Sequence, residues 1–225
     1  MSAHQIVQTV RGIARDEVMQ RWTTATGLVR SLHGGTEHAC TVQLRDSGLV
    51  LPRVPIAVGV LGSAALPNEG DLVVVAFAGG DVHAPVIVGS LYDERTAPPE
   101  HGSGQIVLNL PAGETADDSR LLLMVEVPGD GTRKATLTLG GSVTVSVAID
   151  DEGVTISAGE ASLALTQTSS SDGSAELTVG QSSVRIEQGG DVTISASGTL
   201  KLEATNIEIS GDATVKIAGQ TIDLN

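Results

Sequence analysis

Aromatic side chains are almost missing from this chain of 225 residues. Trp22, Phe77 and Tyr92 are the only three, and residues 101–225 contain none. Proteins that bind or cleave polysaccharide usually line a groove with aromatic rings and carboxylates. Single-stranded nucleic acid is usually bound on stacking platforms of aromatic residues. The second half of the chain therefore disfavours both kinds of site.

Cysteine and long apolar runs are equally scarce. Cys40 is the only cysteine, so no intrachain disulfide can form. It lies in an alternating segment, where we expect a buried and inert thiol. No apolar run reaches the 18 residues typical of a transmembrane helix. The N-terminus also lacks the charged-then-apolar pattern of a signal peptide. We therefore expect a protein that is made and assembled in the cytoplasm, without a leader.

Basic residues are too few to attract polyanions. Residues 1–100 carry 7 basic and 10 acidic residues, and residues 101–225 carry 6 and 17, for a formal net charge of −14. A surface of this sign repels nucleic acid and anionic lipid at long range. We expect neither as a resting partner.

Motifs for catalysis or metal binding are also missing. The sequence has no Gly-x-Ser-x-Gly elbow and no phosphate-binding Gly-x-x-x-x-Gly-Lys-[Ser/Thr] loop. His33 and His38 would lack further metal ligands, so we interpret them as solvated loop residues. Asp117-Asp118 and Asp150-Asp151-Glu152 are interpreted as solvated charge in turns. We expect no catalytic residue, no metal and no cofactor.

A short repeat dominates the last forty residues. Pairs of aliphatic residues flank one polar residue, and the pairs recur every seven or eight positions with Gly, Asn, Asp and Ser between them. Period-2 alternation predicts short strands with one buried face, separated by turns. We interpret this pattern as rungs of a β-solenoid rather than a hairpin sandwich. The predicted core residues are Val184, Ile186, Val192, Ile194, Leu200, Leu202, Ile207, Ile209, Val215, Ile217, Ile222 and Leu224.

One chain with two aliphatic side chains per rung cannot enclose a core of useful width. Three chains wound about a common axis can do so, each supplying one face of a triangular prism. Close packing on that axis favours Val, Ile and Leu over rings. An intertwined homotrimer is therefore the leading prediction, and a single-chain solenoid and a β-sandwich remain alternatives.

The rest of the chain divides by composition into an all-β protein with a helical start. Residues 1–22 predict a helix with an apolar stripe of Ile6, Val10 and Ile13. Residues 23–93 predict an OB-type barrel. Residues 94–104, rich in Pro and Gly, predict a linker or neck, and residues 105–225 the trimeric β-helix. The barrel strands are expected at Thr26–Leu32, Ala39–Leu44, Leu49–Val54, Asp71–Phe77 and Pro85–Ser90.

Three motifs near the end of the predicted barrel resemble a known family. They are the Gly70-Asp71 strand start, the Gly80-Asp81-x-x-x-Pro85 turn and the Val88-Gly-x-Leu-Tyr92 ending. The segment 46–55 is similar as well. Together they resemble the spike OB domain of contractile injection machines, which includes phage baseplate assembly protein V and VgrG of type VI secretion.

The resemblance implies a structural trimer rather than an enzyme. Three barrels would form a collar, and a needle would pierce the target envelope and meet the membrane only during puncture. The chain is too short to hold the large VgrG hub domain, so a separate hub protein is implied, with tube or effector proteins as further candidate partners. A trimeric tailspike that binds or cleaves surface polysaccharide is the alternative.

The last rung predicts a blunt end. Thr221, Ile222, Asp223, Leu224 and Asn225 bring no polar cap, no metal ligands and no taper. Open strand edges at such an end can pair with another β element. The family resemblance supplies a conical PAAR-type tip protein, and we expect one per trimer. The location would then be a phage-tail-like particle.

Overall fold

A computed structural model of the chain describes residues 23–127, 129 and 131–223. The predicted helix over residues 1–22 lies outside this range. Contacts between Cα atoms divide the chain into two units, one up to Met124 and one from Val125 onward. Each unit is described on its own. The regular elements of the described residues are β-strands, as predicted, apart from one short 3₁₀ turn, η1 (Ala78–Gly80).

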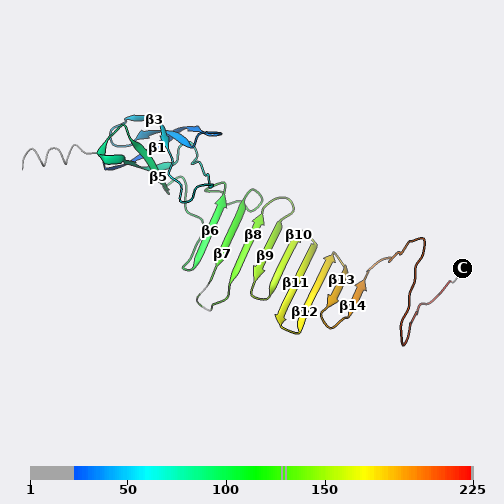
Figure 1. The fold of residues 1–225 in the computed structure, drawn as a ribbon. Coiled ribbons are helices and arrows are strands. Elements are labelled where there is room, and N and C mark those ends of the chain that lie inside the picture. The colour runs from blue at the N-terminus through cyan, green and yellow to red at the C-terminus, as the bar shows by residue number, and fades with distance from the viewer. Residues whose placement is uncertain (1–22, 128, 130, 224–225) are drawn as a thin grey trace, which may run out of the picture. The chain divides into compact units, whose positions relative to one another are not determined.

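The first unit contains a five-stranded antiparallel barrel (Figure 1). Its strands are β1 (Thr24–His33), β2 (Ala39–Leu44), β3 (Val50–Pro55), β4 (Leu72–Phe77) and β5 (Pro85–Leu91). The order in the sheet is β3-β2-β1-β4-β5. The two outer strands meet at a seam, where Ile56 forms a parallel bridge with Ile87 and the Ala57 N–H donates to the Ile87 carbonyl at 2.8 Å. All five expected strands are confirmed, with ends that differ by one or two residues.

Alternation along these strands builds the barrel core. β2 and β4 bury every second residue, and their inward side chains join those of β1, β3 and β5. Gly27 lets β1 pass close to β2, because a Cβ at this position would overlap with the Val42 side chain. The core residues are Val29, Cys40, Val42, Leu44, Leu51, Val54, Val73, Val75, Phe77 and Ile87.

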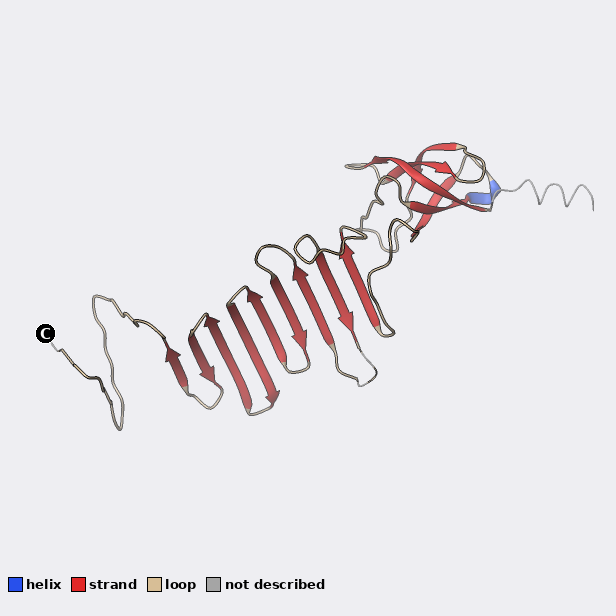
Figure 2. Cartoon of the chain, turned by 180° about the vertical axis from the view of Figure 1, so that it is seen from behind, coloured by secondary structure: helices blue, strands red, loops and turns tan. Residues whose placement is uncertain are grey.

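A nine-stranded sheet follows the barrel in sequence. Its strands are β6 (Gln105–Leu110), β7 (Leu121–Glu126), β8 (Lys134–Leu139), β9 (Val145–Asp150), β10 (Gly153–Ala158), β11 (Ala161–Ser169), β12 (Asp172–Val179), β13 (Ser182–Glu187) and β14 (Val192–Ser195). Their order in the sheet is their order in the chain, so the sheet is a meander. Figures 1 and 2 view β8–β14 from opposite sides, and neither view shows a second layer of described residues over them.

Tight turns explain the meander. Gly159 and Gly180 have φ of 58° and 56°, a left-handed conformation that suits two-residue hairpin turns. The chain therefore reverses at each turn and pairs with itself. The predicted solenoid differs from this arrangement, because a solenoid corner carries the chain onward instead of reversing it. Within one chain, the predicted repeat forms strands only at its first two positions, β13 and β14, and residues 196–223 contain no strand.

Candidate assembly surface

One face of the nine-stranded sheet is aliphatic from β8 to β14. The register of each strand pair places aliphatic residues opposite one another, and these pairs join into rows that cross the sheet. The middle row is Leu137, Val147, Ile156, Leu163, Leu177, Val184 and Ile194. The row beside it is Ala135, Ile149, Val154, Leu165, Ala175, Ile186 and Val192. We call these two rows the aliphatic face.

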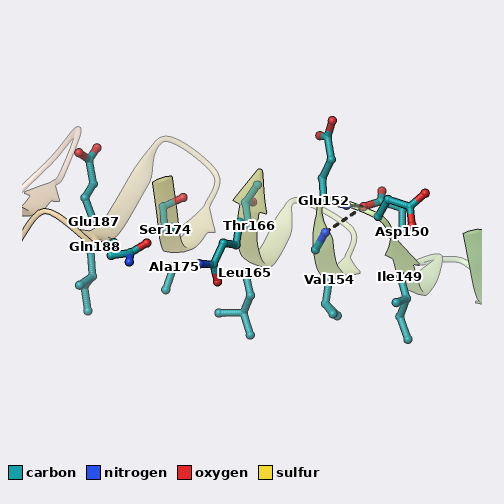
Figure 3. Close-up of a pocket in the computed structure, with 15 residues that line it drawn as sticks. Ile149, Asp150, Glu152, Val154, Leu165, Thr166, Ser174, Ala175, Glu187 and Gln188 are labelled. Atoms are coloured by element: carbon teal, nitrogen blue, oxygen red, sulfur yellow. Dashed lines mark hydrogen bonds between the residues drawn. The ribbon is translucent and has the colours of Figure 1, made fainter. Parts of the chain in front are cut away.

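The opposite face is mostly polar, because successive strand residues point to opposite sides. Figure 3 shows this division, with Val154 and Leu165 on one side of the sheet and Glu152, Thr166 and Ser174 on the other. One row of this polar face is Thr138, Ser146, Ser157, Ser162, Thr178, Ser183 and Ser195. Within it the hydroxyls of Ser146 and Ser157 lie 2.7 Å apart and form a hydrogen bond.

No segment among the described residues of the same chain covers the aliphatic face. Leu177 is 49% exposed, although it lies in the middle of the sheet and is flanked by Leu163 and Val184. The buried hydrophobic residues of the described chain all lie between Val29 and Ile87, in the barrel. A flat apolar area of this extent marks an interaction surface.

Charged groups gather along one edge of the sheet, where β9 turns into β10 and β13 into β14. Asp150 accepts hydrogen bonds from the N–H groups of Glu152 and Gly153 at 2.9 and 3.0 Å, which closes the first turn. Arg133 reaches Asp151 from across the sheet edge, at 2.6 Å between Nη2 and Oδ1. Hydrogen bonds from Arg133 lower the pKa of the Asp151 carboxyl, and the bond from the backbone N–H has a larger effect than the bond from the side chain.

A shallow hollow of about 700 Å³ lies at this same edge, between the turns (Figure 3). Three of its four acidic residues already serve local structure: Asp150 caps a turn, Asp151 pairs with Arg133, and Glu187 pairs with Arg185 at 2.8 Å. On the polar face, Arg185 also reaches Glu176 at 3.3 Å. The carboxylates at Asp150-Asp151-Glu152 thus sit in a turn, as predicted from the sequence.

The comparison with protein families concerns the barrel. Residues 26–92 match the model of the type VI secretion system/phage-baseplate injector OB domain. The barrel is an injector OB domain. The matched segment contains the Gly70-Asp71 start and the Val88–Tyr92 ending that first suggested this family. No curated protein matches the chain.

The family match supports a structural role in a baseplate. Several titratable groups of the barrel have ordinary hydrogen-bond partners, whereas the buried Nε2 atom of His38 has none among the described residues. Cys40 is fully buried, as predicted, and burial raises the pKa of its thiol. The interpretation of His33 and His38 as solvated loop residues is wrong. His33 is the last residue of β1, is half-buried and hydrogen-bonds with the Thr41 hydroxyl at 2.9 Å, and His38 is half-buried as well. Hydrogen bonds from the backbone N–H and ring of His83 lower the pKa of Asp81. Among residues 23–223 as described, no group of three His, Cys, Asp or Glu could hold a metal ion.

The predicted core residues fall into two sets. Val184, Ile186, Val192 and Ile194 lie together on the aliphatic face. The other predicted core residues that the structure describes lie after β14 and do not belong to the sheet. They are 50–67% exposed: Leu200, Leu202, Ile207, Ile209, Val215, Ile217 and Ile222. Thr221 and Asp223 of the predicted tip are exposed as well, whereas Leu224 and Asn225 lie outside the described residues.

The predicted core residues omit much of the aliphatic face. Leu137, Val154 and Leu177 also alternate with polar residues, but their spacing is looser than in the regular repeat of the last forty residues. The spacing varies because the turns differ in length, whereas the antiparallel register keeps all three on one side of the sheet. The alternation of aliphatic and polar residues was the signal by which these positions could have been found.

In the part of the chain that the structure describes, no helix is long and apolar enough to cross a membrane.

Proposed function

We propose that the chain is the central spike of a contractile injection system or contractile phage-tail baseplate, and that it works as a structural, non-enzymatic homotrimer. Three injector OB domains form the collar beneath a separate hub protein. Residues 105–225 of the three chains form the needle that pierces the target envelope. The family match over residues 26–92 supports the assignment to a baseplate or injection system. The exposed aliphatic face supports assembly into a homotrimer.

The observation that carries the proposal is the exposure of that face. Its large side chains, such as Ile149, Ile156 and Leu165, remain 44–50% exposed in one chain. Fully burying a Val, Leu or Ile side chain stabilises by about 1.5–3 kcal/mol, so covering the exposed half of each contributes on the order of 1 kcal/mol. A surface without charge that repeats over seven strands is best covered by an identical surface. Three such sheets, edge to edge around an axis, close into a triangular prism with all aliphatic faces inside.

The needle then has two kinds of segment. From β8 to β14 each chain hydrogen-bonds to itself and contributes a complete face. From residue 196 to 223 the aliphatic pairs continue every seven or eight residues, but the backbone forms no strand within the chain. Backbone N–H and C=O groups that enter a core need partners. We infer that these partners belong to the other two chains, which intertwine in this segment.

This arrangement resists bending and shear. Pairing between chains leaves few open strand edges. Intertwined chains separate only if many hydrogen bonds break together. The short hydroxyl side chains of the polar face point outward in the prism, so the needle is narrow and wetted along its length. The same outer face lacks aromatic residues, which disfavours the alternative of a polysaccharide-binding tailspike.

The needle ends in a site for a tip protein. Residues Thr221–Asn225 of three chains would form a blunt triangular platform with open strand edges, which invites a further β element. A conical PAAR-type protein fits this platform, one per trimer. Deleting Thr221–Asn225 should abolish co-purification of the co-expressed PAAR-type protein and leave the trimer intact. Equal binding to the truncated trimer would place the contact elsewhere.

Light scattering of the purified full chain tests the assembly. We expect a mass three times the 22.9 kDa of one chain at every workable concentration. A stable folded monomer would contradict the proposal, because its aliphatic face would be left in water. A dimer would instead indicate two sheets stacked as a sandwich. Cleavage of surface polysaccharide by the purified trimer would favour the tailspike alternative.

A further inference from the structure

The barrel has an apolar groove of about 380 Å³ between two of its turns. One wall is residues 49–52, where the turn after β2 leads into β3. The other wall is Val82, His83 and Pro85, where the turn after β4 leads into β5. Val50 is 51% exposed there, and His83 is the only ionisable residue among the lining residues. The groove therefore suits an apolar occupant rather than a polar one.

The chain enters the barrel at the same end as these two turns. On one side of β1, the Arg45 N–H in the turn after β2 donates to the Thr26 carbonyl at 3.0 Å. On the other side, the N–H of Phe77, the last residue of β4, donates to the Thr23 carbonyl at 3.2 Å. Phe77 also pairs with Pro85, a residue of the groove wall. Thr23 is thus two strand spacings from Pro85, a distance of about 10 Å.

Residues 1–22 lead directly into this end of the barrel. Their predicted helix has an apolar stripe, and Trp22 comes next to Thr23. The stripe consists of Ile6, Val10 and Ile13. Three arginines and two acidic residues lie in this segment, whereas residues 23–93 contain three arginines and six acidic residues. The segment therefore has a net positive charge and the barrel a net negative one, which favours contact between them.

We propose that residues 1–22 fold back across this end of their own barrel and fill the groove, with the apolar stripe against Val50 and Trp22 beside Pro85. In proteins, most helical stability comes from packing an apolar face against a partner. Val82, which is only partly buried against the barrel core, gains a cover in the same contact. The segment is joined to the barrel at Thr23, and short linkers give effective concentrations on the order of mM. Its own groove is therefore favoured over that of a second copy.

Fluorescence of the full chain tests this contact, because Trp22 is the only tryptophan. In the unchanged protein we expect emission at short wavelength and weak quenching by acrylamide. Val50→Asp puts a carboxylate in the groove, so it should shift the emission to longer wavelength and raise the quenching constant severalfold. Val88→Asp is the matched control, because Val88 is 53% exposed and does not line the groove. It should leave both readings unchanged.

Three results of this experiment would overturn the proposal. The first is free quenching of Trp22 by acrylamide in the unchanged protein. The second is identical emission and quenching in the unchanged protein and in Val50→Asp. The third is an equal shift in Val88→Asp, because the change would then not depend on the groove. Circular dichroism of each variant checks that the barrel remains folded, which we expect because Val50 and Val88 are half exposed.

Cross-linking locates the segment without a charge in the groove. The double variant Ile13→Cys with Val50→Cys is treated with a short thiol-reactive cross-linker, and Cys40 is fully buried and stays in place. We expect the two new thiols to be bridged within one chain, which keeps the mass of one chain on a denaturing gel. The control, Ile13→Cys with Val88→Cys, should give no bridge.

Two results of the cross-linking would contradict the proposal. Covalent dimers or trimers would place residues 1–22 on a neighbouring barrel. Two unbridged thiols in the first double variant would mean that the segment does not reach the groove. The contact lies within one barrel, so either result leaves the proposed trimeric spike intact.

Discussion

The barrel and the nine-stranded sheet use the same alternation of aliphatic and polar residues, yet only the barrel has a core. Val42 and Val73 in the barrel are fully buried, whereas Val179 and Ile186 in the sheet are 57% and 50% exposed. The barrel strands curl until β3 meets β5, so inward side chains face one another. The sheet strands continue side by side, and their aliphatic face meets no other described segment. The alternation of aliphatic and polar residues thus specifies an aliphatic face on a sheet. Whether the sheet closes into a barrel decides whether one chain can bury that face.

The difference predicts where each region obtains its stability. The barrel should depend on contacts within one chain, and the sheet on contacts between chains. Substitutions on the aliphatic face should therefore act on assembly, and substitutions in the barrel core on the barrel alone.

The largest effect is expected from Leu177→Asp, in the middle of the aliphatic face. Three carboxylates would enter the prism interior without partners, at a cost of several kcal/mol each. Light scattering should show loss of the trimer. Thr178→Asp is the matched control, because it places the same charge one residue along on the polar face, and it should keep the trimer mass. Equal loss of the trimer in both variants would contradict the assignment of Leu177 and Thr178 to opposite faces of the sheet.

A smaller and local effect is expected from Leu44→Ala in the barrel. Leu44 is 1% exposed, and truncating a buried Leu typically costs about 2–5 kcal/mol of unfolding free energy. The melting transition of the barrel should fall while the mass by light scattering stays that of the assembled protein. Leu32→Ala, at a 39% exposed position of β1, should change the transition little. Loss of assembly in Leu44→Ala would mean that the two regions are not independent.

Gly153→Ala tests the packing of strands within the sheet. A Cβ at Gly153 would overlap with the Leu165 carbonyl, so β10 and β11 must move apart, at a cost of about 1–3 kcal/mol. Thermal melting should show a lower transition. Gly189 has open space around it, so Gly189→Ala should be close to neutral. A neutral Gly153→Ala would contradict the β10–β11 register.

The smallest effect is expected on the melting temperature at acidic pH. The pKa of Asp151 is lowered in the folded chain, mainly by the Arg133 N–H. Its contribution to stability is therefore present above the unfolded pKa, close to 3.8, and is lost as the pH falls through the lower folded value. Asp151→Asn should lower the melting temperature slightly at pH 7, and the gap to the unchanged protein should narrow below pH 4. A gap that persists at low pH would contradict an ionic origin.

The sequence was sufficient to locate the strands of the barrel but not their partners. All five barrel strands were predicted, because turn residues such as Gly70 and Gly80 separate clear runs of alternation. The meander was not predicted from Gly159 and Gly180, because a glycine with positive φ serves a solenoid corner and a hairpin equally well.

The amino-acid sequence by itself determined the all-β character, the positions of the barrel strands and the division of side chains between two faces, because these depend on neighbours in the chain. The tertiary structure alone decided that β6–β14 pair with themselves, that Leu137 and Leu177 share one face, and that residues 196–223 find no strand partner in their own chain. Register and closure depend on hydrogen bonds between residues far apart in sequence, and a local pattern contains no information about which of several compatible strands will be the partner.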